Sequence, residues 1–191
     1  FKKYYTEDIT LVEDFFSASA YNSVEERKAT IITSIAMFYD LEDPIAFASQ
    51  IESVLHDNGI WHFEQSYMPS MLRTNSYDTI CHEHLEFYSL GSVINILSKA
   101  NLKIIDVQMN SINGGSFAVT AAKKDSALSE NEPVIDWLLS QEKSMGLSTP
   151  KPYRDFEERV FRHRDDLTRL IRSLNSDGKT IAGFFYEPIM G

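Results

Sequence analysis

One nearly continuous apolar run, Ala29–Tyr39 (ATIITSIAMFY), constrains the fold of this chain more than any other stretch. It is rich in β-branched residues, which is typical of a central strand covered on both faces in a parallel sheet. The segment after it, Asp43–Gly59, opens with Asp-Pro, which suits a helix cap and first helical position, and then repeats apolar residues at helical spacing. It predicts a helix that ends at Gly59. Residues 59–66 (GIWHFEQS) predict the next strand. This alternation predicts an α/β fold in which right-handed crossovers join parallel strands.

The remaining elements extend this α/β pattern in both directions. Residues 9–16 (ITLVEDFF) predict an earlier strand, and residues 89–101 predict a second helix with Ser89 as its cap. Residues 102–110 and 116–124 predict two further strands, and the turn sequence Ser-Ile-Asn-Gly-Gly between them indicates an antiparallel pair. We therefore expect the last strand of the sheet to be antiparallel.

The second half of the chain has a different pattern. Residues 124–133 (KDSALSENEP) are polar and rich in turn-forming residues, as expected of a linker. Two later segments carry apolar residues at three- and four-residue steps, which predicts helices. The end of the chain, with GKTIAGFF, predicts the first strand of a second Rossmann-like domain. We therefore divide the chain into a partial α/β domain, a linker with a helical segment, and the start of a further domain, at residues 1–123, 124–177 and 178–191.

Composition restricts the partners. The net charge of −10 argues against nucleic acid, because binding to a phosphate backbone needs a basic face. No apolar run approaches the roughly 20 residues that span a bilayer, and the first residues lack the apolar core of a signal peptide. The single cysteine, Cys81, excludes an internal disulfide and fits a reducing compartment. We expect a cytoplasmic protein with no membrane or nucleic-acid partner.

The stretch Tyr77–Ser89 (YDTICHEHLEFYS) is the richest in reactive side chains. Cys81, His82 and His84 could coordinate a metal ion, but successive side chains of a strand point to opposite faces, and no partner Cys-X-X-Cys pair occurs. Alternatively, His84 beside the Glu83 carboxylate could move a proton near neutral pH. The segment could also be a polar loop that leads into the next helix. The local sequence leaves these alternatives open.

Two further groups lie at predicted strand ends, where ligands bind in open α/β sheets. Residues 64–67 (Glu-Gln-Ser-Tyr) could position a substrate there, or could form an ordinary strand-end turn. Asp14 could accept a hydrogen bond from an amine, and Phe15 could stack on a flat ring. No glycine-rich loop follows an early strand, so a Rossmann-type nucleotide site is incomplete in this sequence.

Four segments, in this order, resemble the S-adenosylmethionine-dependent sugar C-methyltransferases. They are ATIITSIAMFYDLEDPIAFASQI, DNGIWHFEQSYMPSML, YDTICHEHLEFYSL and NGGSFAVTAA. The resemblance extends from about Phe1 to Asp177, and HEHLEFYSL together with NGGS is specific. These enzymes methylate a ring carbon of a nucleotide-linked keto-deoxysugar. The family combines a small zinc-binding amino-terminal domain, a class I methyltransferase domain and a carboxyl-terminal Rossmann-like domain, and the resemblance implies the class I fold for this sheet.

The resemblance also implies roles for individual residues. A base removes the proton alpha to the sugar ketone, and the enolate then attacks the methyl group of S-adenosylmethionine. His84 is implied as this base or as part of its relay, with Glu83 as its partner. The implied substrate-binding residues are Glu64, Gln65, Ser66, Tyr67, His82 and Asn113. The implied cofactor-binding residues are Asp14, Phe15, Ser34, Ile35, Ala36, Met37 and Phe38, and no metal ion is implied for this part of the chain.

Three departures from the family pattern qualify this assignment. The residue before HEH is often a tyrosine in the family and is Cys81 here, so either its role is lost or another phenol, that of Tyr67 or Tyr77, reaches the catalytic site. The zinc domain and the glycine-rich cofactor loop precede Phe1 in the family. The glycine-rich turn that follows GKTIAGF in the family is replaced by FYEPIMG. We therefore expect this chain alone to be a poor methyltransferase.

Two other functions remain open at this point. One is a homologue that keeps a sugar-nucleotide-binding or structural role and has lost catalysis. The other is a metal-dependent enzyme that uses Cys81, His82 and His84.

Overall fold

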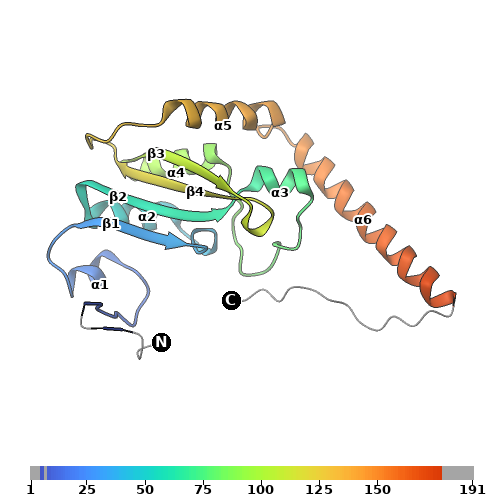
Figure 1. Cartoon of the computed structure of the whole chain (residues 1–191), viewed down its shortest axis with the longest axis horizontal. Coiled ribbons are helices and arrows are strands. Elements are labelled where there is room, and N and C mark those ends of the chain that lie inside the picture. The colour runs from blue at the N-terminus through green and yellow to red at the C-terminus, as the bar shows by residue number, and fades with distance from the viewer. Residues whose placement is uncertain (1–4, 7, 178–191) are drawn as a thin grey trace.

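A computed structural model describes residues 5, 6 and 8–177, and its centre is a four-stranded sheet (Figure 1). The strands are β1 (Ala29–Ile35), β2 (Leu55–Ser66), β3 (Leu102–Asn110) and β4 (Ser116–Lys123). Their spatial order is β1-β2-β4-β3. β1 and β2 are parallel, whereas β4 is antiparallel to both of its neighbours. The expected α/β sheet with an antiparallel last strand is therefore confirmed.

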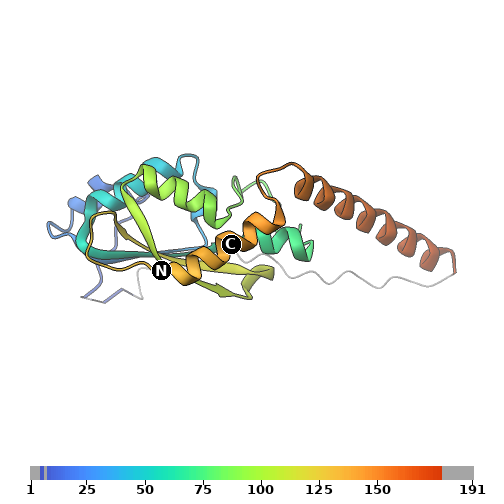
Figure 2. The ribbon, with the colours of Figure 1, turned by 90° about the horizontal axis from the view of Figure 1, so that it is seen from above.

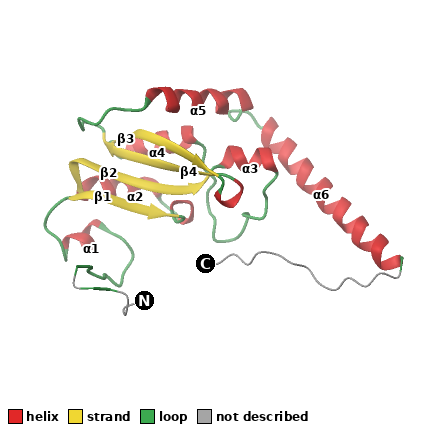
Figure 3. Ribbon diagram, viewed as in Figure 1, coloured by secondary structure: helices red, strands yellow, loops and turns green. Residues whose placement is uncertain are grey.

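Helices cover one face of this sheet and one of its edges. α2 and α4 lie side by side on one face, and α5 runs along the β3 edge (Figure 2). α6 projects away from the sheet beyond α3 (Figure 3). The helices are α1 (Ala18–Asn22), α2 (Pro44–Val54), α3 (Met68–Thr74), α4 (Leu90–Lys99), α5 (Glu132–Met145) and α6 (Lys151–Ser176), with short 3₁₀ helices η2 (Phe38–Asp40) and η3 (Ile112–Gly114). None of the helices within the described residues is long and apolar enough to cross a membrane.

The main core lies between the sheet and the layer of α2 and α4, because alternate residues of each strand point to that side. On β2, Trp61 and Phe63 are fully buried and pair in register with Ala121 and Val119 of β4. The ring of Phe38 packs against both, with centroid distances of 5.5 and 5.2 Å. Burying each of these aromatic side chains contributes about 1.5–3 kcal/mol. This packing fixes the carboxyl ends of β1 and β2.

The expected helix caps are confirmed, but one helix end is not. The Asp43 side chain accepts a hydrogen bond from the backbone N–H of Ala46, and Pro44 occupies the first turn of α2. Ser89 caps α4 in the same way. The prediction that Gly59 ends α2 is wrong, because the helix ends at Val54 and Gly59 lies inside β2. A Cβ atom at position 59 would lie 2.8 Å from the carbonyl oxygen of Ala29. Gly59 therefore allows β1 and β2 to approach.

Two strand predictions need correction. β1 is an edge strand of the described sheet, and Ile31 and Ile35 are 64% and 56% exposed. A central strand covered on both faces was expected. In the described part of the chain, helices do not cover both faces of β1. The strand predicted for residues 9–16 is wrong, because this segment joins no sheet in the described part of the chain. A strand needs a partner for its backbone groups, and the local sequence alone cannot supply one.

The carboxyl-terminal part agrees with the expected linker and helices. A loop leads from β4 to α5, and α6 is a single helix of 26 residues. α3, whose first five residues are Met68–Leu72, was not predicted from the sequence. Pro69 lies in its first turn and all five residues of that segment are buried. The strand expected in residues 178–191 lies outside the described residues.

Candidate active site

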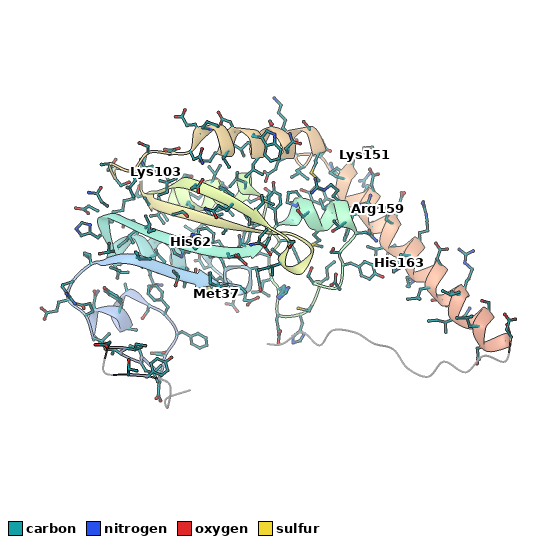
Figure 4. All side chains as sticks on the ribbon, in the orientation of Figure 1. Met37, His62, Lys103, Lys151, Arg159 and His163 are labelled. Carbon is teal, nitrogen blue, oxygen red and sulfur yellow. The ribbon has the colours of Figure 1, made fainter. Side chains whose placement is uncertain are left out.

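The site lies at one end of the sheet, where β1 and β2 end and β4 begins. After β1 the chain turns sharply at Ala36, whose φ of 53° is in the left-handed region. This conformation costs about 1–2 kcal/mol for a residue with a Cβ atom. A hydrogen bond from the Ala36 N–H to the carbonyl of Glu64 holds it in place at 2.9 Å. The turn directs Met37 and η2 toward the loop of residues 75–88, below α3 in Figure 4.

Backbone hydrogen bonds fasten the loop of residues 75–88 at two places. The N–H of Met68, at the start of α3, donates to the carbonyl of Tyr88 at 2.9 Å. The N–H groups of Leu85 and Glu86 both donate to the carbonyl of Tyr39 in η2, at 3.0 and 3.1 Å. The residue just before this double contact, His84, is therefore held directly beside η2.

The imidazole of His84 has a defined orientation. Its Nδ1 lies 2.7 Å from the carbonyl oxygen of Thr79. Because a carbonyl oxygen can only accept, Nδ1 must carry a hydrogen, and in the neutral ring the lone pair is then on Nε2. The ring also packs against Tyr39, with 4.4 Å between centroids. An imidazole fixed in one tautomer with Nε2 available has the properties of a general base.

The carboxylate near this imidazole is not the one that the sequence indicated. An oxygen of Glu83, the expected partner of His84, lies 3.8 Å from Nε2 of His82, and both of these side chains are mostly exposed. The Thr79 carbonyl, not Glu83, contacts His84. Asp40 is a carboxylate that the sequence reasoning missed. Burial raises the pKa of Asp40, the charge of His84 lowers it and that of Glu83 raises it, so Asp40 lies within electrostatic range of both His84 and Glu83.

The two tyrosines expected near the base are engaged elsewhere. The Tyr77 hydroxyl lies 2.6 Å from Nδ1 of His163 on α6 (Figure 4). The Tyr67 hydroxyl donates to the Glu142 carboxylate of α5 at 2.8 Å. Burial, and then this carboxylate, raise the pKa of Tyr67, so it stays a neutral donor to Glu142. Neither hydroxyl is hydrogen-bonded to His84.

The expected substrate-binding residues divide between the two faces of the sheet. Glu64 is half-buried on the face without helices and accepts a hydrogen bond from the Asn110 amide at 3.0 Å. Gln65 points to the opposite face, is only 2% exposed, and has no partner for either amide atom within the described residues. Ser66 pairs in register with Ser116. His82 is exposed in the loop of residues 75–88, and Asn113 belongs to η3.

The expected cofactor-binding residues are not brought together. Asp14 and Phe15 border a cavity of about 740 Å³ between α1 and the first residues of β1. The segment Ser34–Phe38 lies at the other end of that strand. Two of its members are structural, because the Ser34 hydroxyl accepts a hydrogen bond from the Trp61 indole and Phe38 is buried in the core. Phe15, in contrast, is 93% exposed.

The metal-dependent alternative gains no geometric support. Within residues 5, 6 and 8–177, no three His, Cys, Asp or Glu side chains are grouped so that they could hold a metal ion. Cys81 is a partly buried free thiol.

Comparison with known families gives two matches that together extend over most of the chain. Residues 5–107, more than half of the chain, match the family described as a methyltransferase domain, and residues 111–185 match the C-methyltransferase C-terminal domain. The chain belongs to the S-adenosylmethionine-dependent methyltransferase family. This membership confirms the class I methyltransferase fold, and S-adenosylmethionine is the cofactor of the family. The expected division at residues 123 and 177 stays a prediction.

One C-methyltransferase and two other methyltransferases show the extent of the similarity. The chain is 31% identical over 156 residues to the C-methyltransferase NovU of Streptomyces niveus, which covers 82% of this chain and 37% of NovU. The chain thus spans little more than a third of that relative. The solved O-methyltransferase NcsB1 from neocarzinostatin biosynthesis, bound to S-adenosylmethionine and 2-hydroxy-5-methyl naphthoic acid, is 13% identical with a TM-score of 0.40, over 51% of this chain and 29% of NcsB1. The N-methyltransferase NodS from Bradyrhizobium japonicum WM9 is 15% identical with a TM-score of 0.38, over 52% and 53% of the two chains.

Proposed function

We propose that the protein carrying this chain methylates a carbon next to the ketone of a nucleotide-linked keto-deoxysugar. The observation that carries the proposal is the oriented imidazole of His84, because a C-methyltransferase needs a base to make carbon nucleophilic. The resemblance of the HEHLEFYSL and NGGS segments to sugar C-methyltransferases supports the substrate class. The match of residues 111–185 to the C-methyltransferase C-terminal domain and the similarity to the C-methyltransferase NovU support the reaction type.

In the proposed reaction, Nε2 of His84 removes the proton alpha to the ketone. The electron pair of the broken C–H bond forms the carbon–carbon double bond of an enolate, and the carbonyl electrons move to oxygen. The cofactor, when bound, supplies an electrophilic methyl group. The Asp40 carboxylate lies within electrostatic range of the imidazole, so we assign it to stabilising the positive charge that the ring gains with the proton.

We assign residues of the described chain to parts of the two ligands. Phe15 offers an exposed ring for an adenine base, and Asp14 beside it offers a carboxylate acceptor. Exposed atoms of Ile35 and Ala36 at the end of β1 are the remaining candidates on the cofactor side. Glu64, which Asn110 orients, is assigned to a sugar hydroxyl.

A methyl-transfer assay with the full-length protein tests this function. The protein is incubated with methyl-labelled S-adenosylmethionine and a panel of nucleotide-linked keto-deoxysugars, and the matched control is the same panel with each ketone reduced to an alcohol. We expect labelled methyl groups on carbon next to the ketone, and none with the alcohols, because an alcohol has no acidic alpha proton. Methyl transfer to oxygen, or no transfer from any ketone, would contradict the proposal and favour a binding homologue without catalysis.

A further inference from the structure

A second reactive group, the phenol of Tyr39, lies directly beside His84. Its ring centroid is 4.4 Å from that of the imidazole, with 58° between the ring planes. Its backbone carbonyl accepts the two hydrogen bonds from the loop residues that follow His84. Ring contact and backbone contact therefore fix Tyr39 and His84 relative to each other as one unit.

The Tyr39 hydroxyl is available for a ligand, although the residue as a whole is buried. It makes no hydrogen bond to any described residue. It is also not one of the unpaired polar atoms that are fully enclosed by protein. It therefore keeps contact with solvent. An unpaired hydroxyl that water can reach can also be reached by an oxygen atom of a substrate.

Three other tyrosines border the same loop, and their hydroxyls are not available. The hydroxyl of Tyr67 is bonded to Glu142, and that of Tyr77 is bonded to His163. The hydroxyl of Tyr88 is fully enclosed in the core, where the Tyr88 ring packs against Phe38. Among the tyrosines that border the loop within the described chain, Tyr39 alone presents an unpaired and accessible phenol.

We propose that Tyr39 donates a hydrogen bond to the substrate oxygen that becomes negatively charged when His84 removes the alpha proton. This role rests on the proposed function. The proton moves from carbon to Nε2 of His84, the C–H electron pair becomes the second bond between the two carbons, and the oxygen gains the carbonyl electron pair. Tyr39 keeps its proton throughout and contributes only the hydrogen bond. A fixed donor at the atom where charge develops stabilises the transition state more than the ground state.

The surroundings of Tyr39 keep it in the donating form. Burial raises the pKa of its phenol, and the nearby charges of Asp40 and Cys81 raise it further. A tyrosine with a raised pKa stays protonated through the neutral range, so it can donate. The partly buried Cys81 thiol thus lies within electrostatic range of the phenol.

Hydrogen exchange at the alpha carbon measures this step without methyl transfer. The full-length protein and a nucleotide-linked keto-deoxysugar are placed in D₂O without S-adenosylmethionine, and loss of the alpha proton signal is followed by NMR. We compare Tyr39→Phe, which keeps the ring on His84, with Tyr153→Phe on α6, where the lost hydroxyl donates to the carbonyl of Leu147 in the native protein. Tyr39→Phe should slow saturated exchange about 10²–10³-fold with little change in KM, whereas Tyr153→Phe should exchange at the wild-type rate.

Fluorotyrosine at position 39 gives a second readout that does not depend on removing the hydroxyl. It keeps the shape of the side chain but lowers its phenol pKa. The alkaline limb of the pH profile, where the exchange rate falls because the phenol loses its proton, should therefore move to lower pH. Wild-type exchange rates in Tyr39→Phe, or an unmoved alkaline limb with fluorotyrosine, would overturn the role of Tyr39 and leave the proposed function intact. If the wild-type protein neither exchanges nor methylates any ketone of the panel, the proposed function itself fails.

Discussion

A single buried carboxylate, that of Glu142 on α5, connects three elements of the fold. It accepts hydrogen bonds from the Tyr67 hydroxyl at 2.8 Å and from the N–H groups of Leu90 and Gly91 at 2.6 and 3.0 Å. These two N–H groups lie at the start of α4 and have no acceptor within the helix itself. A negative charge at this position also complements the helix dipole. Glu142 therefore ties α5 and α4 to the residue that follows β2.

Replacing this carboxylate should destabilise the protein. In Glu142→Gln an amide group faces N–H donors, so at least one buried hydrogen bond is lost and the charge is removed. We expect the free energy of unfolding to fall by about 1–3 kcal/mol, measured by urea denaturation. The matched control is Gln141→Ala, at the exposed neighbouring position, which should change it by less than about 0.5 kcal/mol. Equal effects of the two substitutions would show that the Glu142 contacts contribute nothing.

At the residue scale, the local sequence predicted those contacts that join residues close together in the chain. The caps Asp43 and Ser89 bond to residues three positions away, and both were found from sequence. The contact between Tyr67 and Glu142 joins residues 75 positions apart, so no local pattern indicates it. Tyr39 was likewise missed, because its proximity to His84 arises only when the loop folds onto η2.

The turn between β3 and β4 depends on a close approach of its backbone to α3. Gly114 and Gly115 have φ values of 78° and 128°, which residues with a Cβ atom rarely adopt. A Cβ atom at position 115 would lie 2.6 Å from the Cβ atom of Ser70 in α3. The Asn-Gly-Gly sequence therefore serves both the hairpin and its packing against α3.

Substitution of Gly115 separates these two effects. Gly115→Ala adds conformational strain and a clash with α3, whereas Gly146→Ala at the end of α5 adds strain only, because the nearest atom there is 3.7 Å away. We expect Gly146→Ala to cost about 1–2 kcal/mol of unfolding free energy and Gly115→Ala to cost more, measured by urea denaturation of both variants. A smaller loss for Gly115→Ala than for Gly146→Ala would contradict the packing of the turn on α3.

At the element scale, helices followed from periodicity, whereas the position of each strand in the sheet did not. The segments predicted as α2, α4, α5 and α6 are helices because amphipathic spacing is a local property. The apolar run of β1 was taken to indicate a central strand, but which strands flank it is decided by chain segments far away in sequence. Periodicity also gave no signal for α3, which is too short to show a repeat.

At the scale of the whole molecule, α6 is joined to the rest of the chain near the site. The Arg159 guanidinium donates to the carbonyl of Leu72, and His163 meets the Tyr77 hydroxyl (Figure 4). Phe156 packs into a small cluster with Met68 and Met71 of α3. Further along, α6 leaves Leu167 and Leu170 exposed. The position of the loop of residues 75–88 is therefore coupled to α6.

The central claim is that His84 removes a proton from substrate carbon, and alpha-proton exchange of His84→Ala in the full-length protein tests it most directly. The control is His56→Ala, whose imidazole is exposed at the opposite end of β2. Binding of S-adenosylmethionine, measured by calorimetry, reports whether each variant keeps its cofactor site. We predict that His84→Ala lowers the exchange rate about 10²–10⁴-fold with unchanged cofactor binding, and that His56→Ala exchanges normally. Exchange by His84→Ala at the wild-type rate would contradict the account.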